Sequence, residues 1–150
     1  MTTLSFFVSG SPVAYQRTRV ATSTFGKLRF LTPAESRDWR DQVASVATLE
    51  ARRQGWKVAR GPLTVTVVVH RPIPASTPRK RAATLAGTPC TVRPDVDNYA
   101  KLVMDAGAPM VDGKRNPILW EDDAQVWKIT AEKRWCEAKD AGVAVTVTCG

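Results

Sequence analysis

One segment carries most of the information about fold and chemistry, and it reads RPDVDNYAKLVMDA over residues 93–106. Pro94 favours an extended backbone ahead of it, and Asp97 or Asn98 can cap a helix that runs to about Ala106. Apolar residues recur in this helix at intervals of three and four, which predicts a buried stripe. The stripe consists of Tyr99, Leu102, Val103 and Ala106.

The opposite face of this helix is charged. Asp97, Lys101 and Asp105 follow one another at steps of four residues. Asp95 and Asp97 are two apart in the extended segment, so both carboxylates can point to one side, next to the positive end of the helix dipole. Two such carboxylates repel each other, so the pair is either a cap with a solvated neighbour or half of a metal site. The first alternative is a surface helix with an Asp97–Lys101 pair.

A second acidic cluster lies downstream, where residues 120–126 read WEDDAQV and lead into a strand pattern. Carboxylates from two segments, without a His or Cys pair, are hard oxygen ligands. Such ligands suit Mg²⁺ or Mn²⁺ rather than zinc. The two clusters together therefore favour the metal-site interpretation.

The two clusters in this order resemble a known family. The pattern Asp95-x-Asp97-Asn98-x-x-Lys101-x-x-x-Asp105, followed by Trp120-x-Asp122-Asp123-Ala124-Gln125-Val126, is similar to the RusA family of Holliday-junction resolvases, which prophages often encode. The resemblance covers about residues 93–148. The chain departs from the pattern in its connector, residues 107–119, which is longer than the short turn expected there and carries Gly113, Lys114, Arg115 and Pro117.

The resemblance implies roles for individual residues. Asp95, Asp97 and Asp123 would be the essential metal-binding carboxylates, and Lys101 would be the essential lysine. Asp105 and Asp122 would be supporting acids. The resemblance also implies a homodimer, which suits an enzyme that makes two related cuts on opposed strands.

The charge is divided unevenly along the chain. The formal net charge is +8, and 43% of the 150 residues are hydrophobic, which is enough for one compact domain over residues 1–150. Residues 1–94 hold 15 Lys and Arg against 4 Asp and Glu, or +11, whereas residues 95–150 hold 7 against 10, or −3. A basic half joined to an acidic half fits a polyanion that one part holds and metal ions on the other part cut.

The cysteines and the N-terminal residues indicate in which cellular compartment the protein is expected. Cys90, Cys136 and Cys149 are an odd number without CxxC spacing, and His70 is the single histidine, so we expect reduced thiols and no zinc finger. No basic segment followed by a long apolar run opens the sequence, and no window approaches 18 uninterrupted apolar residues. We therefore expect a cytoplasmic protein that does not contact a membrane.

Alternating patterns predict the elements of the first half. Residues 4–8 and 63–69 alternate as strands. Between them, residues 15–29 are polar and basic, and they form either a solvated hairpin or a surface in which Arg17 and Arg19 contact phosphates. The capping box in residues 32–35 opens a helix that Gly55 closes, with a stripe of Trp39, Val43, Val46 and Ala47.

Residues 70–94 have a different composition, with five prolines, five Arg or Lys, no acid and almost no periodicity. We predict a long basic loop that closes over a DNA backbone, because a loop of this length in a compact domain is usually functional. The alternative is an insertion without contacts. The DNA-binding candidates in it are Arg71, Arg79, Lys80, Arg81 and Arg93.

The C-terminal part alternates over residues 125–135 and again over 143–147, which predicts a hairpin. The fold class is therefore α+β, with two main helices packed on a mixed sheet. The leading functional hypothesis is a Mg²⁺-dependent endonuclease that nicks four-way DNA junctions as a symmetric homodimer. The alternatives are a nuclease of other branched DNA, such as flaps or forks, and a junction-binding protein without catalysis.

Overall fold

The structure, a computed structural model, describes residues 1–16, 19–22, 28–31 and 34–150. Strands and helices alternate irregularly along the chain, which confirms the α+β class. Two long helices match the prediction, and the described residues contain a third, short one. The elements are β1 (Thr2–Ser9), β2 (Arg19–Thr22), β3 (Leu28–Leu31), α1 (Ala34–Gln54), β4 (Leu63–Pro72), α2 (Arg79–Leu85), α3 (Val96–Gly107), β5 (Met110–Val111), β6 (Lys114–Arg115), η1 (Asp123–Gln125), β7 (Val126–Cys136), η2 (Ala138–Asp140) and β8 (Gly142–Cys149).

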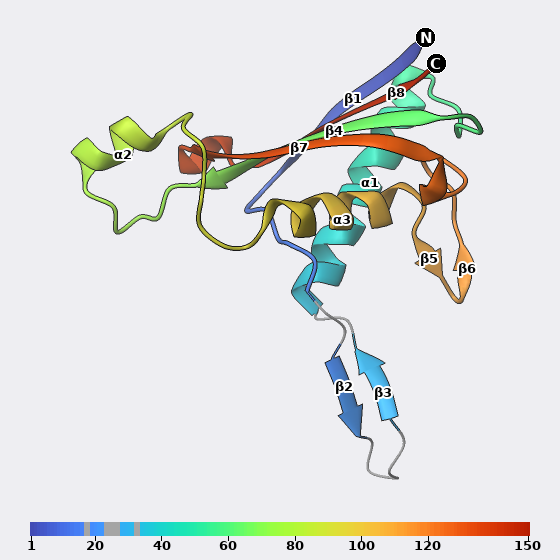
Figure 1. Ribbon diagram of the computed structural model, residues 1–150, viewed down its shortest axis with the longest axis horizontal. Coiled ribbons are helices and arrows are strands. Elements are labelled where there is room, and N and C mark those ends of the chain that lie inside the picture. The colour runs from blue at the N-terminus through green and yellow to red at the C-terminus, as the bar shows by residue number, and fades with distance from the viewer. Residues whose placement is uncertain (17–18, 23–27, 32–33) are drawn as a thin grey trace.

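The main sheet has four strands in the order β1-β8-β4-β7 (Figure 1). The β1–β8 and β8–β4 pairs are antiparallel and the β4–β7 pair is parallel, so the sheet is mixed as predicted. The predicted C-terminal hairpin is wrong, because β7 and β8 lie on either side of β4. Val143, Val145 and Val147 of β8 are almost completely buried, which suits a central strand, whereas Trp127 of β7 is 69% exposed at the edge.

Helices α1 and α3 cover one face of the sheet (Figure 1). Their predicted apolar stripes pack against inward-facing residues of β1, β4 and β8. The α3 stripe is buried throughout, and the α1 stripe is buried except at Val46, which is only partly covered. The core therefore lies between these two helices and the sheet, and it fixes α3 on the sheet surface.

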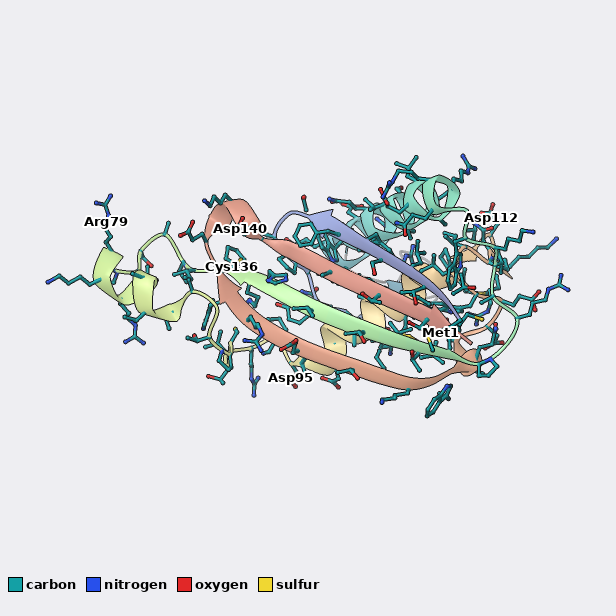
Figure 2. All side chains as sticks on the ribbon, turned by 90° about the horizontal axis from the view of Figure 1, so that it is seen from above. Met1, Arg79, Asp95, Asp112, Cys136 and Asp140 are labelled. Carbon is teal, nitrogen blue, oxygen red and sulfur yellow. The ribbon has the colours of Figure 1, made fainter. Side chains whose placement is uncertain are left out.

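The prediction of a single basic loop over residues 70–94 is wrong. Strand β4 continues to Pro72, and α2 forms beyond it, past the end of the sheet, with Arg79 on its exposed surface (Figure 2). Arg, Lys, Ala and Leu favour helix formation, but α2 buries none of its residues. A helix without a buried face has no apolar stripe, which explains why periodicity missed it.

The connector between α3 and the second acidic cluster contains a small hairpin of β5 and β6. Its turn residues, Asp112 and Gly113, have φ of 51° and 74°, as a two-residue turn with both residues left-handed requires. The connector thus contains a defined hairpin that carries Arg115.

The N-terminal predictions are confirmed where the structure describes them. Strand β1 buries Leu4, Phe6 and Val8, and β2 pairs with β3 as an antiparallel hairpin. Helix α1 ends at Gln54, before Gly55 with φ of 72°. The capping residues Thr32 and Pro33 lie outside the described residues. Within the described part of the chain, no helix has the length and apolar character needed to cross a membrane.

Candidate active site

The acidic helix begins earlier than predicted. Asp95 occupies the N-cap position with extended backbone angles, and Asp97 lies inside the first turn rather than in an extended segment. Both side chains are exposed, and both lie near the partial positive charge of the helix N-terminus. Neither the Asp95 nor the Asp97 carboxylate is among the side chains that line the pocket at the other end of α3.

Lys101 and Asp105 continue along the charged face of α3, as the spacing predicted. The Lys101 ammonium lies over the ring of Tyr15, whose backbone N–H donates to the carbonyl of Asn98. Asp105 is a further turn along, and eight residues of helix separate it from Asp97, or about 12 Å along the axis. One cation therefore cannot bind Asp97 and Asp105 together while α3 keeps this geometry.

Asp123 is held at the start of η1 by the buried side chain of Trp120. The indole Nε1–H of Trp120 donates to Asp123 Oδ1 at 2.8 Å. Trp120 packs directly on Gly107, where any Cβ would overlap its ring. The carbonyl of Gly107 also accepts the backbone N–H groups of Ile118 and Leu119. These contacts tie Asp123 to the C-terminal end of α3.

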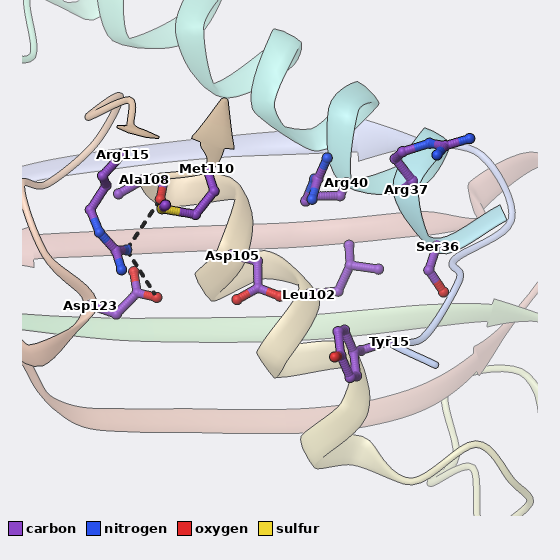
Figure 3. A pocket seen from close by; sticks show the side chains of 10 residues that line it. All are labelled: Tyr15, Ser36, Arg37, Arg40, Leu102, Asp105, Ala108, Met110, Arg115 and Asp123. Carbon is purple, nitrogen blue, oxygen red and sulfur yellow. Dashed lines mark hydrogen bonds and ion pairs between the residues drawn. The ribbon is translucent and has the colours of Figure 1, made fainter. Parts of the chain in front are cut away.

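Asp105 and Asp123 face one pocket of about 230 Å³ (Figure 3). Burial raises the pKa of the Asp105 carboxyl, the charge of Asp123 raises it further, and nearby Lys101, Arg40 and Arg115 oppose the rise. A carboxyl group with a raised pKa beside a second carboxylate in a concave site is typical of functional sites. The pocket is lined by Tyr15, Ser36, Arg37, Arg40, Leu102, Asp105, Ala108, Met110, Arg115 and Asp123.

Asp122, the neighbouring acid, has a structural partner. Its side chain accepts the backbone N–H of Ala124 at 2.8 Å, while Gln125 Oε1 accepts the backbone N–H of Asp122. Gln125 Nε2 donates to the carbonyls of Ala59 and Gly61. Asp122 therefore shapes the turn that presents Asp123.

Two cations hold the chain just before Asp95. Lys133 Nζ donates to the carbonyls of Val92 and Pro94, both at 2.7 Å. Arg71 Nη1 donates to the carbonyl of Arg93 at 2.7 Å, and the Arg71 guanidinium lies over the Trp135 ring. Arg71, a predicted DNA-binding residue, is thus engaged by the protein backbone.

Sequence reasoning missed Lys133, although a signal was present. Residues 127, 129, 131 and 135 of β7 are apolar, and Lys133 interrupts this series on the same side of the strand. A charge on an otherwise apolar face indicates a polar partner, which here is the segment 92–94.

The other predicted DNA-binding residues are dispersed. Arg79, Lys80 and Arg81 are exposed on α2, and Arg93 is exposed before α3. Arg19 lies in β2, and Arg17 falls outside the described residues. The six of the seven predicted basic residues that the structure describes therefore lie on separate elements, β2, the end of β4, α2 and the segment before α3.

Asp105 and Asp123 fit a divalent cation in chemistry, because they are hard oxygen donors from two elements that face one space. In the described part of the chain, however, no group of three or more His, Cys, Asp or Glu side chains converges closely enough to hold a metal ion. The expected set of Asp95, Asp97 and Asp123 is not assembled there.

Comparison with known proteins identifies the family. The sequence model of the endodeoxyribonuclease RusA family matches residues 9–148. "Uncharacterized protein YqaN" of Bacillus subtilis (strain 168) is 33% identical over 141 residues, a match that covers 91% of each chain. The family match spans both acidic clusters, the connector between them and three of the four strands of the main sheet, β4, β7 and β8. The chain therefore belongs to the RusA family of endodeoxyribonucleases.

Proposed function

We propose that this protein is a Mg²⁺-dependent endonuclease that resolves four-way DNA junctions by paired nicks, in DNA recombination and repair. The observation that carries the proposal is the family match over residues 9–148, which includes every acid of both motifs. The pocket between α1, α3 and η1, where Asp105 and Asp123 meet, supports a site for phosphodiester chemistry. Mn²⁺ is an alternative to Mg²⁺.

A phosphodiester resists hydrolysis because its negative charge repels the nucleophile and its alkoxide is a poor leaving group. When bound, divalent cations supply the positive charge that activates water and offsets charge on the leaving oxygen. We propose Asp95, Asp97 and Asp123 as the carboxylates that hold them. The three are not assembled in the described structure, so the proposal requires that they come together when DNA and cations bind. Asp105 supports Asp123 in the pocket, and Asp122 supports it through the turn.

Lys101 is proposed as the catalytic lysine. Its ammonium lies over the ring of Tyr15, a residue that lines the pocket, and on the same helical face as Asp97 and Asp105. From there it can donate hydrogen bonds to the attacking water or to the phosphate as negative charge develops.

The assembly and the compartment are also proposals. Two symmetric cuts on opposed strands require two copies of the site, which a homodimer with a two-fold axis supplies. The three cysteines are free thiols, which is compatible with the reducing cytoplasm.

Cleavage assays with labelled DNA test the proposal. Four-way junctions, flaps, forks and linear duplexes are incubated with the protein in Mg²⁺ and, separately, in EDTA. We expect paired nicks in the four-way junction in Mg²⁺ and no cleavage in EDTA. Preferred cleavage of flaps or forks would identify a nuclease of other branched DNA, and binding without cleavage would identify a junction-binding protein.

A further inference from the structure

Three arginines line the pocket that contains Asp105 and Asp123. Arg37 and Arg40 come from the first turns of α1, and Arg115 comes from β6 on the opposite side (Figure 3). The lining side chains include three guanidinium groups and two carboxylates. Arg40 also pairs with the Asp41 carboxylate at 3.2 Å, and Lys101 lies near enough to act on Asp105, so four cationic groups still face three acids. An anion is therefore the complementary ligand, and a phosphate group matches the fork of N–H donors on arginine.

Arg115 is held weakly. Its Nη1 lies 3.7 Å from Asp123 Oδ2, which is longer than a typical N–H···O hydrogen bond, and 3.3 Å from the carbonyl of Ala108. The side chains of Arg115 and Asp123 are 38% and 33% exposed, so solvent screens their attraction. A bidentate contact between an arginine and a phosphate is stronger than such a pair. Arg115 can therefore leave the Asp123 carboxylate and bind a phosphate instead.

We propose that Arg37, Arg40 and Arg115 bind a phosphate of the DNA backbone in this pocket, and that Arg115 leaves Asp123 for that phosphate. This inference rests on the proposed DNA substrate. Because Arg115 and a cation compete for the same Asp123 carboxylate, release of Arg115 by phosphate makes Asp123 available as a ligand. Phosphate and cation therefore favour each other's binding.

Arg115 lies outside the two acidic motifs. It is on the β5–β6 hairpin, in the connector between them. The hairpin thus adds a phosphate-binding side chain to the acidic site.

The first test is the salt dependence of junction binding, measured in EDTA so that no cation-dependent cleavage occurs. Arg37→Gln/Arg40→Gln should reduce the slope of log affinity against log salt by up to about 1.8, and Arg115→Gln by up to about 0.9, because each lost phosphate contact contributes about 0.9.

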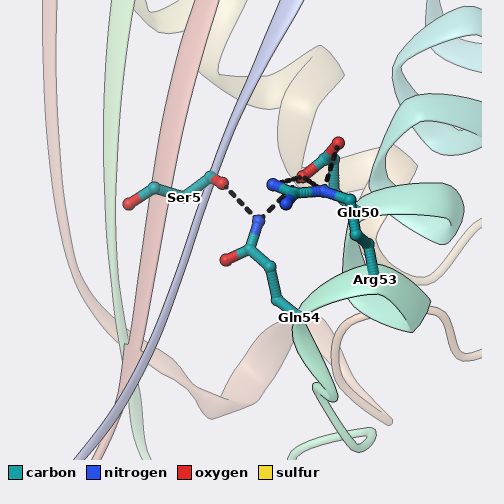
Figure 4. Close-up of polar contacts among 4 residues, drawn as sticks. All are labelled: Ser5, Glu50, Arg53 and Gln54. Atoms are coloured by element: carbon teal, nitrogen blue, oxygen red, sulfur yellow. Dashed lines mark hydrogen bonds and ion pairs between the residues drawn. The ribbon is translucent and has the colours of Figure 1, made fainter.

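The matched control is Arg52→Gln/Arg53→Gln, which removes two charges from the other end of α1. There Arg53 pairs with Glu50, beside the Gln54 contact to Ser5 (Figure 4). We expect its slope to equal that of the wild type. Arg115→Lys keeps the charge and should also keep the slope. Arg115→Met removes the charge and serves as the test protein if Arg115→Gln does not fold.

The second test is calorimetric titration of the DNA-free protein with Mn²⁺. Arg115→Gln removes the competitor for Asp123, so its Mn²⁺ affinity should exceed that of the wild type severalfold. Equal slope losses in the two α1 double variants, or a Mn²⁺ affinity that is unchanged or weaker in Arg115→Gln, would overturn the inference. Neither test needs cleavage, so a wild type that gives these results without cutting DNA would refute the proposed nuclease and leave the phosphate site standing.

Discussion

The ammonium nitrogen of Lys101 lies 4.0 Å from the ring centroid of Tyr15. The Tyr15 backbone is hydrogen-bonded to the Asn98 carbonyl at 2.9 Å, so the ring is fixed relative to α3. Buried Ser36 of α1 donates to the carbonyl of Ala14 and ties the same segment to the other helix. Among the ion pairs of the described residues, none joins Lys101 to Asp97. The Lys101 side chain is therefore held against an aromatic ring that lines the pocket rather than by an ion pair with Asp97.

Replacing Lys101 separates catalysis from stability. An exposed cation–π contact contributes about 0.5–1 kcal/mol, so Lys101→Ala should lower the free energy of unfolding by no more than that. Turnover on a four-way junction should fall by roughly 10²-fold or more, because the donor to developing charge is lost. Tyr15→Phe keeps the ring and should cut nearly normally. Near-normal cleavage by Lys101→Ala would remove this residue from the site.

Helix α2 is expected to bind the DNA backbone, because Arg79, Lys80 and Arg81 are exposed on it and it extends past the sheet. Replacing all three by Ala should reduce the salt slope of junction binding by up to about 2.7, at about 0.9 per contact. A variant with Arg79→Lys and Arg81→Lys keeps the charges and is expected to bind with the wild-type slope. If the alanine variant keeps the full slope, α2 is an insertion without DNA contacts.

The cations that hold residues 92–94 should affect cleavage more than DNA binding. Lys133→Met removes two charge-assisted hydrogen bonds from the segment that presents Asp95, at a cost of about 1–3 kcal/mol in the free energy of unfolding. We expect a larger loss in turnover than in junction affinity. Chemical denaturation and cleavage assays measure the two effects, with Lys128→Met on the same strand as the control.

Arg71 and Lys133 should also be coupled, because both donate to the carbonyl of Val92. In a double-mutant cycle of Arg71→Gln and Lys133→Met, the two losses of stability should not add. Strict additivity together with unchanged turnover would mean that these residues do not position Asp95.

Asp105 should make stability depend on pH. Its pKa is raised from the ordinary value of 3.8, chiefly by burial and then by the charge of Asp123. Between pH 3.8 and the raised pKa the folded protein binds more protons than the unfolded chain, so the free energy of unfolding falls as the pH rises through this window. At pH values above the raised pKa of Asp105, the free energy of unfolding falls no further on account of this group.

Asp105→Asn removes this titration. Its melting temperature should exceed that of the wild type at pH 7, and the difference should shrink as the pH falls toward 4. Asp112→Asn is the control, since Asp112 is exposed in a turn with φ of 51° that Asn also tolerates. Parallel pH profiles for wild type and Asp105→Asn would show that Asp105 is not destabilised by its surroundings.

Local patterns predicted most of the elements, because burial imposes periodicity on the sequence. The stripes of α1 and α3 and the alternation in β1, β4 and β8 all reflect packing against one core. Helix α2 buries none of its residues, so its sequence shows no apolar periodicity. The pairing of β7 with β4 rather than β8 is a choice between non-local partners, which alternation within a strand does not specify.

The candidate site was predictable in its residues but not in its arrangement. The spacing of Asp97, Lys101 and Asp105 predicted that they share one face of a helix. The second acidic cluster identified Asp123 as a further site residue. The position of Asp123 at the same pocket as Asp105 depends on Gly107 accommodating Trp120, which binds Asp123, and Arg115 reaches this pocket from β6 in the connector. These contacts arise from tertiary packing between distant segments, so a local sequence motif does not predict them.

The most direct test of cation-dependent catalysis by the acidic residues is cleavage of a four-way junction in Mg²⁺ by Asp95→Asn, Asp97→Asn and Asp123→Asn. Asn caps a helix as well as Asp does, and it can still accept the Trp120 hydrogen bond at position 123, so the fold should persist. Glu121→Gln, which alters only an exposed pair with Arg60, is the control. We predict that each asparagine variant binds the junction at least as tightly as the wild type and cleaves it roughly 10²-fold more slowly or worse, while Glu121→Gln cleaves normally. Cleavage by the three variants at close to the wild-type rate, or loss of binding and cleavage together through unfolding, would contradict the account.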